Sequence, residues 1–139
     1  MNWNGYIERG DVKRATKDTS LAKALLLMAD NDLLFLGGLE LNETSARKIM
    51  SNYYDTLRSI LEAVAALDGY KVYSHEAFTY FLKEKKEDLF AQKFDRFRKI
   101  RNGINYYGKN ISPQEVSQCK QEITRLIADI KAKYLRNFS

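Results

Sequence analysis

The segment "TSARKIMSNYYDTLRSILEAVAAL", residues 44–67, predicts a long helix and decides the fold class. Apolar side chains recur along it at spacings of three and four, which places them on one face of an α-helix. Asn42 or Thr44 is the expected N-cap, and Asp68-Gly69 the expected end. An amphipathic helix of this length lies along other helices in a bundle. Its apolar stripe consists of Ala46, Ile49, Tyr53, Leu57, Ile60, Val64 and Leu67.

The preceding segment, "TSLAKALLLMADNDLLFLGG" at residues 19–38, predicts a helix over residues 19–36. Thr19 is the expected N-cap, and Gly37-Gly38 the expected left-handed stop. The segment is apolar nearly all round, which favours a central, well-buried helix. It is too short and too interrupted by "DND" to span a bilayer. The N-terminus also has no apolar core like that of a signal peptide, so we expect a cytoplasmic protein without a membrane partner.

Three further helices are expected downstream. One follows the Ser74 cap in "SHEAFTYFLKEK", and one runs from about Glu87 to at least Ile104. The last begins at "SPQE", where Ser112 is the N-cap, Pro113 takes the first helical position and Glu115 completes a capping box. The residues expected to face inward are Phe78, Phe81 and Leu82, then Phe90, Phe94, Phe97 and Ile104, then Val116, Cys119, Ile123, Leu126, Ile130 and Tyr134.

These segments together predict an all-α fold, an antiparallel up-and-down bundle of four to five helices over residues 19–139. Residues 1–18 show no sustained apolar periodicity and are expected to form a short helix or an arm. Cys119 is the only cysteine, so we expect no disulfide framework and no cysteine metal cluster, and we predict no metal and no cofactor. The net charge of +5 permits nucleic acid or an acidic partner.

Arg101 interrupts the stripe of the fourth helix, which otherwise holds phenylalanine and isoleucine. An unpaired guanidinium is costly to bury, so Arg101 needs an acidic partner, a cleft or a second subunit. Asp30 and Asp32 on the first helix are the candidate partners. In the structural interpretation Arg101 only pairs with one of them, and "RNG" only ends a helix. In the functional interpretation Arg101 opens toward a binding groove.

Three stretches resemble the HEPN family, the "higher eukaryotes and prokaryotes nucleotide-binding" helical domains. They are "ADNDLLFL" in the first helix, "NYYDTLRSILEAVAALDGYKVYSHEAFTYFL" in the second and third, and "RKIRNGINYYG" at residues 98–108. The resemblance covers roughly residues 19–135 and rests on short motifs in the right order. It implies a helical bundle that often forms a homodimer. It also implies a ribonuclease or a partner of a minimal nucleotidyltransferase, in toxin–antitoxin modules among others.

The ribonuclease members of that family share an arginine, usually followed by asparagine, with a histidine about five positions later. Arg101 and Asn102 match this motif, whereas Tyr106 takes the place of the histidine. A tyrosine is only about 0.1% ionised near neutral pH, so it is a poor general base. His75, the only histidine, is expected to be a surface or capping residue.

We therefore predict a module that binds RNA or a nucleotide, or that docks a nucleotidyltransferase, without efficient ribonuclease activity. The basic run "KEKKEDLFAQKFDRFRKIR" would follow phosphates toward Arg101, and the two tyrosines would stack on bases. The alternative is a metal-independent ribonuclease toxin that uses Arg101, Asn102 and Tyr106. The predicted ligand-binding residues are Arg101, Tyr106, Tyr107, Asp30, Asp32 and Arg98.

Overall fold

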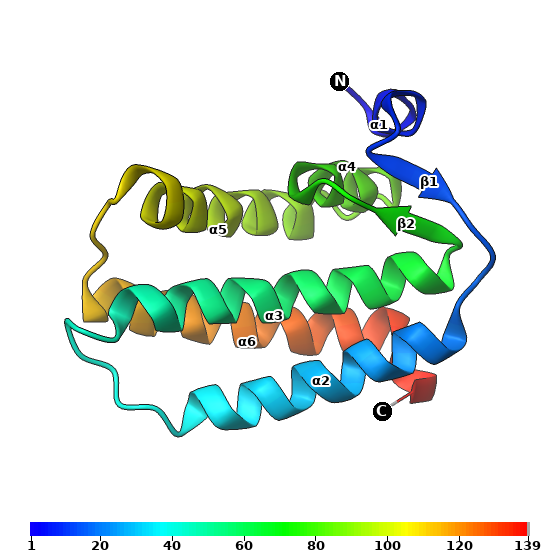
Figure 1. The fold of residues 1–139 in the computed structure, drawn as a ribbon. Coiled ribbons are helices and arrows are strands. Elements are labelled where there is room, and N and C mark those ends of the chain that lie inside the picture. Colours follow the sequence, from blue (N-terminus) through cyan, green and yellow to red (C-terminus); the bar gives the residue numbers. More distant parts are fainter. Residues whose placement is uncertain (139) are drawn as a thin grey trace.

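The computed structural model describes residues 1–138, and these residues form a helical bundle (Figure 1). Helix α3 (Ala46–Leu67) lies between α2 (Thr19–Gly37) and α5 (Asp88–Tyr107), and α6 (Pro113–Tyr134) packs along it. Helix α4 (His75–Glu84) packs on α5, and a short 3₁₀ helix, η1 (Arg136–Phe138), follows α6. The predicted all-α bundle is confirmed. Within the described part of the chain, no helix is both long enough and apolar enough to cross a membrane.

Helix α3 forms the centre of the core, because other helices cover it on several sides. Its predicted stripe is buried at every position except Leu67, which is half-buried. Tyr54, Leu61 and Ala65, outside that stripe, are also fully buried. A helix that packs against three neighbours buries more than the single stripe by which it is recognised.

Helix α2 is not the central, well-buried helix that its apolar composition predicts. It packs on α3 along one side only, through Ala22, Leu26, Ala29 and Leu36. Its opposite side carries several exposed large apolar residues. Apolar content measures how much surface a helix can bury, but it does not say whether a neighbour within the same chain covers that surface. The exposed residues on and just after α2 are Leu27, Met28, Leu34, Phe35 and Leu39.

The N-terminal residues form a short helix, α1 (Trp3–Arg9), and a strand, β1 (Val12–Arg14). Strand β1 pairs antiparallel with β2 (Tyr70–Val72), and Val12 lies opposite Val72. Trp3 is buried with its ring 5.2 Å from that of Tyr70 and 5.5 Å from that of Phe81. The sequence did not predict these strands, because three residues are too few for a period of two to be seen.

The helix ends agree with the sequence in part. The Ser112 side chain accepts from the Glu115 amide at 3.1 Å, and Gly108 (φ 64°) ends α5 in the left-handed region. The predicted N-cap of α2 was wrong by one residue, because the Asp18 carboxylate, not Thr19, accepts from the Leu21 amide. The predicted left-handed stop was also wrong, since Gly38 ends α2 with a right-handed φ of −91°.

Candidate functional site

Arg101 lies between α5 and α3, and its side chain is only 15% exposed. Its guanidinium carbon lies 5.6 Å from the centre of the Tyr54 ring and 5.8 Å from that of Tyr106. Its Nη2 is 3.6 Å from Asp55 Oδ1, and its Nη1 donates a long hydrogen bond of 3.5 Å to the Tyr106 hydroxyl. The arginine is therefore held by two aromatic rings and one carboxylate, at the edge of the core.

The predicted pairing of Arg101 with Asp30 or Asp32 is wrong. Asp30 accepts from Lys131 Nζ of α6 at 2.7 Å, and Asp32 is exposed. Asp55 of α3 takes their place, with its Oδ1 3.6 Å from Nη2 of Arg101. Helical periodicity identified the arginine as unusual but did not identify which neighbouring helix would face it.

His75 is not the surface or capping residue that the sequence predicted. Its Nδ1 lies 3.2 Å from the Tyr54 hydroxyl, and Tyr54 itself is fully buried. Desolvation, together with the nearby positive charges of Arg58, Arg101 and Arg98, lowers the pKa of His75 to about 4. His75 is therefore neutral near neutral pH, and cationic side chains lie near it.

Three arginines, from two helices, lie near enough to His75 for their charges to lower its pKa. Arg58 of α3 is paired with Glu62 at 3.2 Å, and Arg98 of α5 donates to Asp95 at 2.8 and 3.1 Å. Among the described residues, the Nε atoms of Arg58 and Arg101 are buried without a hydrogen-bond partner. Buried donors in proteins are nearly always satisfied, so an acceptor at this position would remove an energetic penalty. We call Arg58, Arg98, Arg101 and His75 the arginine cluster.

Asp55 connects the arginine cluster to two adjoining hollows on the surface. One, of about 410 Å³, lies between the start of α3 and the end of α5 and includes Arg47 and Lys48. The other, of about 340 Å³, includes Asp32 and Phe35 of α2. Both include Asn52 and Asp55, and we call them together the Asp55 groove. Burial raises the pKa of Asp55, against the effect of Arg101 and Arg58, which lower it.

The other predicted site residues lie at the end of α5. Tyr106 and Tyr107 are 69% and 77% exposed, and Tyr106 touches Arg101. Asn102 is half-buried and makes no side-chain hydrogen bond within residues 1–138. Asn105, which the sequence did not single out, accepts from the Ser51 hydroxyl at 3.1 Å and lines the Asp55 groove. The structure thus brings Arg101 and Tyr106 into contact near the end of α5, where Tyr107 also lies, whereas Arg98 lies in the middle of that helix.

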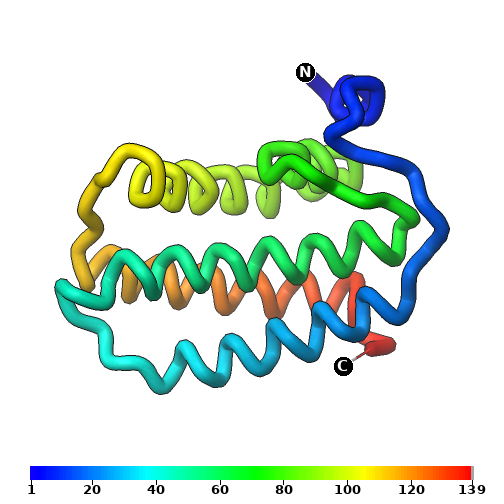
Figure 2. The backbone as a smooth tube through the Cα atoms, viewed as in Figure 1, coloured from blue at the N-terminus to red at the C-terminus, as the bar shows by residue number. Residues whose placement is uncertain are grey.

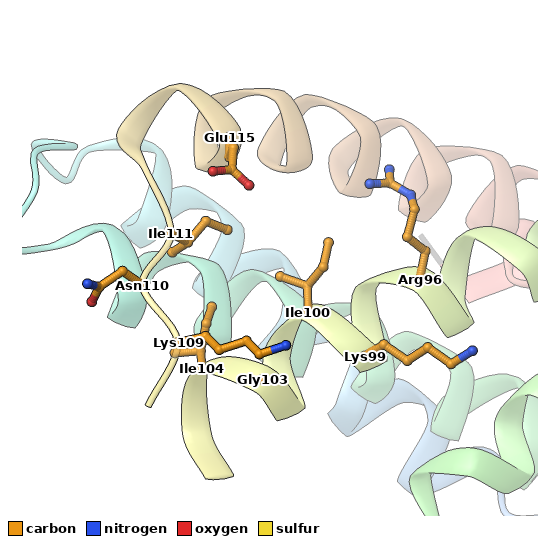
Figure 3. Close-up of a pocket in the computed structure, with 9 residues that line it drawn as sticks. All are labelled: Arg96, Lys99, Ile100, Gly103, Ile104, Lys109, Asn110, Ile111 and Glu115. Carbon is orange, nitrogen blue, oxygen red and sulfur yellow. The ribbon is translucent and has the colours of Figure 1, made fainter. Parts of the chain in front are cut away.

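A further hollow of about 360 Å³ lies between α5 and the start of α6 (Figure 3). Its cations are Arg96, Lys99 and Lys109, and Glu115 is the carboxylate among its lining residues. Lys109 lies along Gly103, and a Cβ at that glycine would come within 3.2 Å of the lysine Cδ. The glycine of the "RNG" motif therefore lets the lysine fold back over the helix. Positive charge surrounds the end of α5 on both sides.

In comparisons with protein-family models, with characterised proteins and with solved structures, this chain has no match. Across the described residues, no group of three histidine, cysteine or acidic side chains is arranged to hold a metal ion.

Proposed function

We propose that the arginine cluster binds the phosphate groups of single-stranded RNA. The observation that carries this proposal is the proximity of three arginines to one neutral histidine, with two buried guanidinium Nε–H groups that have no acceptor among the described residues. Phosphate oxygens accept from planar guanidinium groups in a bidentate manner, and such charge-assisted hydrogen bonds are stronger than neutral ones. A bound phosphate would satisfy these donors and offset the local positive charge.

The surroundings of the cluster support a polymer rather than an isolated phosphate. Tyr106 and Tyr107 present their rings to solvent beside Arg101, where the bases of a single strand can stack on them. Arg47 and Lys48 extend the positive charge along the Asp55 groove, and Lys109 extends it on the other side of α5. A strand that crosses the end of α5 would meet cations at its backbone and aromatic rings at its bases.

The single histidine provides a direct test of phosphate binding. We expect the pKa of His75, followed by NMR as pH is varied, to be about 4 in the free protein. Inorganic phosphate and a short RNA oligonucleotide should each raise it toward its ordinary value, because an anion beside the imidazole favours the protonated form. A rise of roughly one unit corresponds to about 1.4 kcal/mol of interaction.

Sodium chloride at matched ionic strength is the control for that titration, since it screens charge without occupying a phosphate site. If phosphate and RNA move the pKa of His75 no more than chloride does, the proposed site is not an anion site. If phosphate alone raises it and RNA does not, the ligand is a small phosphate compound rather than a polymer.

The position of His75 favours a second candidate function, the cleavage of RNA. In the tautomer that donates Nδ1–H to the Tyr54 hydroxyl, Nε2 carries the lone pair and can take the proton of a 2′-hydroxyl. The 2′-oxygen would bond to phosphorus with Arg101 stabilising the charge of the phosphorane, and the P–O5′ bond would then break, with water supplying the proton to the leaving 5′-oxygen. This arrangement supplies the base that Tyr106 cannot, from a different helix than the sequence predicted.

For this second candidate, His75→Gln is expected to abolish cleavage of a mixed RNA substrate while RNA affinity stays within a few-fold of wild type. Glutamine retains polarity and similar size but cannot accept a proton, so only the proton transfer is lost, at a cost of roughly 10²–10⁴ in rate. Tyr106→Phe is the matched control and should cleave like the wild type. Equal cleavage by the His75→Gln variant would exclude His75 as the base.

A further inference from the structure

The exposed apolar side of α2 has a symmetric pattern centred on Asn31. Large apolar residues lie three and four positions to either side of the asparagine, and a small residue lies seven positions to either side. All of these residues are exposed. At a rotation of about 100° per residue they fall within one stripe of the helix. We call this stripe the α2 face; it consists of Ala24, Leu27, Met28, Asn31, Leu34, Phe35 and Gly38.

We propose that the α2 face seats the α2 face of a second copy of this chain, antiparallel, about a two-fold axis at Asn31. This inference goes beyond the proposed function and does not depend on it. The order of large and small residues along this face is the same from either end of the helix. Such a face is complementary to a second copy of itself that runs antiparallel. Leu27 would pack against the second copy's Phe35, Met28 against its Leu34, and Ala24 against its Gly38.

Asn31 favours a second copy over an unrelated apolar partner. It is the only polar side chain on the α2 face, and it stands at the centre. A carboxamide carries both a donor and an acceptor, so two asparagines related by a two-fold axis can satisfy each other. In paired helices, a single buried asparagine of this kind specifies the register and the oligomeric state, at some cost in stability. An apolar partner would leave the amide unsatisfied.

Two charges at the ends of the face, Lys23 and Glu40, come close together in an antiparallel pair. Lys23 lies near the start of α2 and Glu40 just beyond its end, both exposed and without an ion pair among the described residues. Reversal brings Lys23 opposite the second copy's Leu39, next to its Glu40 and near the negative end of its helix dipole. An anionic membrane surface would instead favour lysine and arginine along the whole border, where this chain also has Asp32.

The position of α2 leaves this face free within one copy. Helix α2 lies at the edge of the bundle with α3 on its inner side (Figure 2). Phe35 lines the Asp55 groove, so the second copy's Leu27 would close the outer rim of that groove. The dimer would thereby complete the walls of the groove that leads to Asp55 and Arg101.

Sedimentation or light scattering of the full chain over a range of concentrations tests the dimer. We expect a wild-type dimer, and Leu34→Glu should be a monomer, because dimerisation would press each of the two introduced carboxylates against the second copy's Met28 and leave it without a partner. Leu34 is 81% exposed, so the melting temperature of the monomer should change little beyond the loss of dimerisation. Leu89→Glu, at an exposed leucine of α5, is the matched control and should remain dimeric.

A cysteine at the proposed axis tests the register. Asn31→Cys should form a disulfide between copies on mild oxidation, whereas Gln92→Cys on α5 should not; Cys119 is buried and common to both variants. A wild-type monomer at every concentration, a Leu34→Glu dimer, or equal cross-linking of the two cysteine variants would each overturn the proposal. The phosphate response of His75 in Leu34→Glu reports on the proposed function separately.

Discussion

Arg101→Ala is expected to weaken the binding of single-stranded RNA by about 10- to 150-fold, because hydrogen bonds to charged groups contribute about 1.5–3 kcal/mol each. Arg101 is the member of the arginine cluster that contacts the exposed Tyr106. Its loss therefore removes the central phosphate contact. Fluorescence anisotropy with a labelled oligonucleotide measures the change. Arg101→Lys should recover only part of the affinity, since an ammonium keeps the charge but lacks the planar pair of donors.

Arg125→Ala is the matched control for the loss of one positive charge. Arg125 lies on α6 with 80% of its side chain exposed, and its Nε is 3.5 Å from Asp129 Oδ1 of the same helix. Its removal should change RNA affinity by less than a few-fold, through the general field of the protein alone. Equal losses in the two variants would show that RNA meets a diffuse positive surface and that the arginine cluster is not its site.

Arg101→Ala can also act through stability, because it leaves the Asp55 carboxylate partly buried without its partner. Asp55→Asn in the same chain removes that uncompensated charge. The double variant should therefore regain melting temperature without regaining RNA affinity. If affinity returned together with stability, the arginine would have a structural role only.

Phe94→Ala is expected to cause the largest loss of stability, about 3–5 kcal/mol. Phe94 is fully buried, and its ring lies 5.6 Å from that of Tyr54 and 6.1 Å from that of Phe78. Truncation leaves a cavity at the junction of α3, α4 and α5, which the surrounding helices can fill only partly. Urea denaturation measures the free energy of unfolding, and a fall in melting temperature of roughly 10 °C or more should accompany it.

Leu89→Ala, five positions earlier on the same helix, is the control for that variant. Leu89 is exposed, so its truncation should change the free energy of unfolding by less than about 0.5 kcal/mol. Because Tyr54 rests on Phe94 and contacts His75, Phe94→Ala should also raise the pKa of His75 by admitting water. A stability close to wild type would mean that the aromatic junction is not part of the core.

The arginine cluster shows what could and could not be foreseen. The sequence singled out Arg101 because a charged residue interrupts an apolar stripe, and that signal is local to one helix. His75 reaches the same place from α4 through a contact with Tyr54, twenty-one positions earlier in the chain. No periodicity or short motif connects residues on different helices, so the histidine seemed unremarkable until the helices were packed.

Helix α2 is a helix whose burial the sequence overestimated. Its composition predicted burial, yet α3 and not α2 occupies the centre, and a continuous apolar face remains open. The symmetric pattern about Asn31 was already present in the sequence, but it has meaning only once one side of α2 is known to be covered and the other free.

The sequence by itself determined where the major helices lie, most of their ends and the inward face of α3, α4, α5 and α6, because spacing, capping and turn residues act within a few positions. Only the tertiary structure decided that Arg101 faces Asp55, that His75 joins the arginine cluster, and which side of α2 stays exposed. These outcomes depend on how helices rotate and stack against one another. That packing depends on apolar area buried between segments far apart in the sequence, and no single segment encodes it.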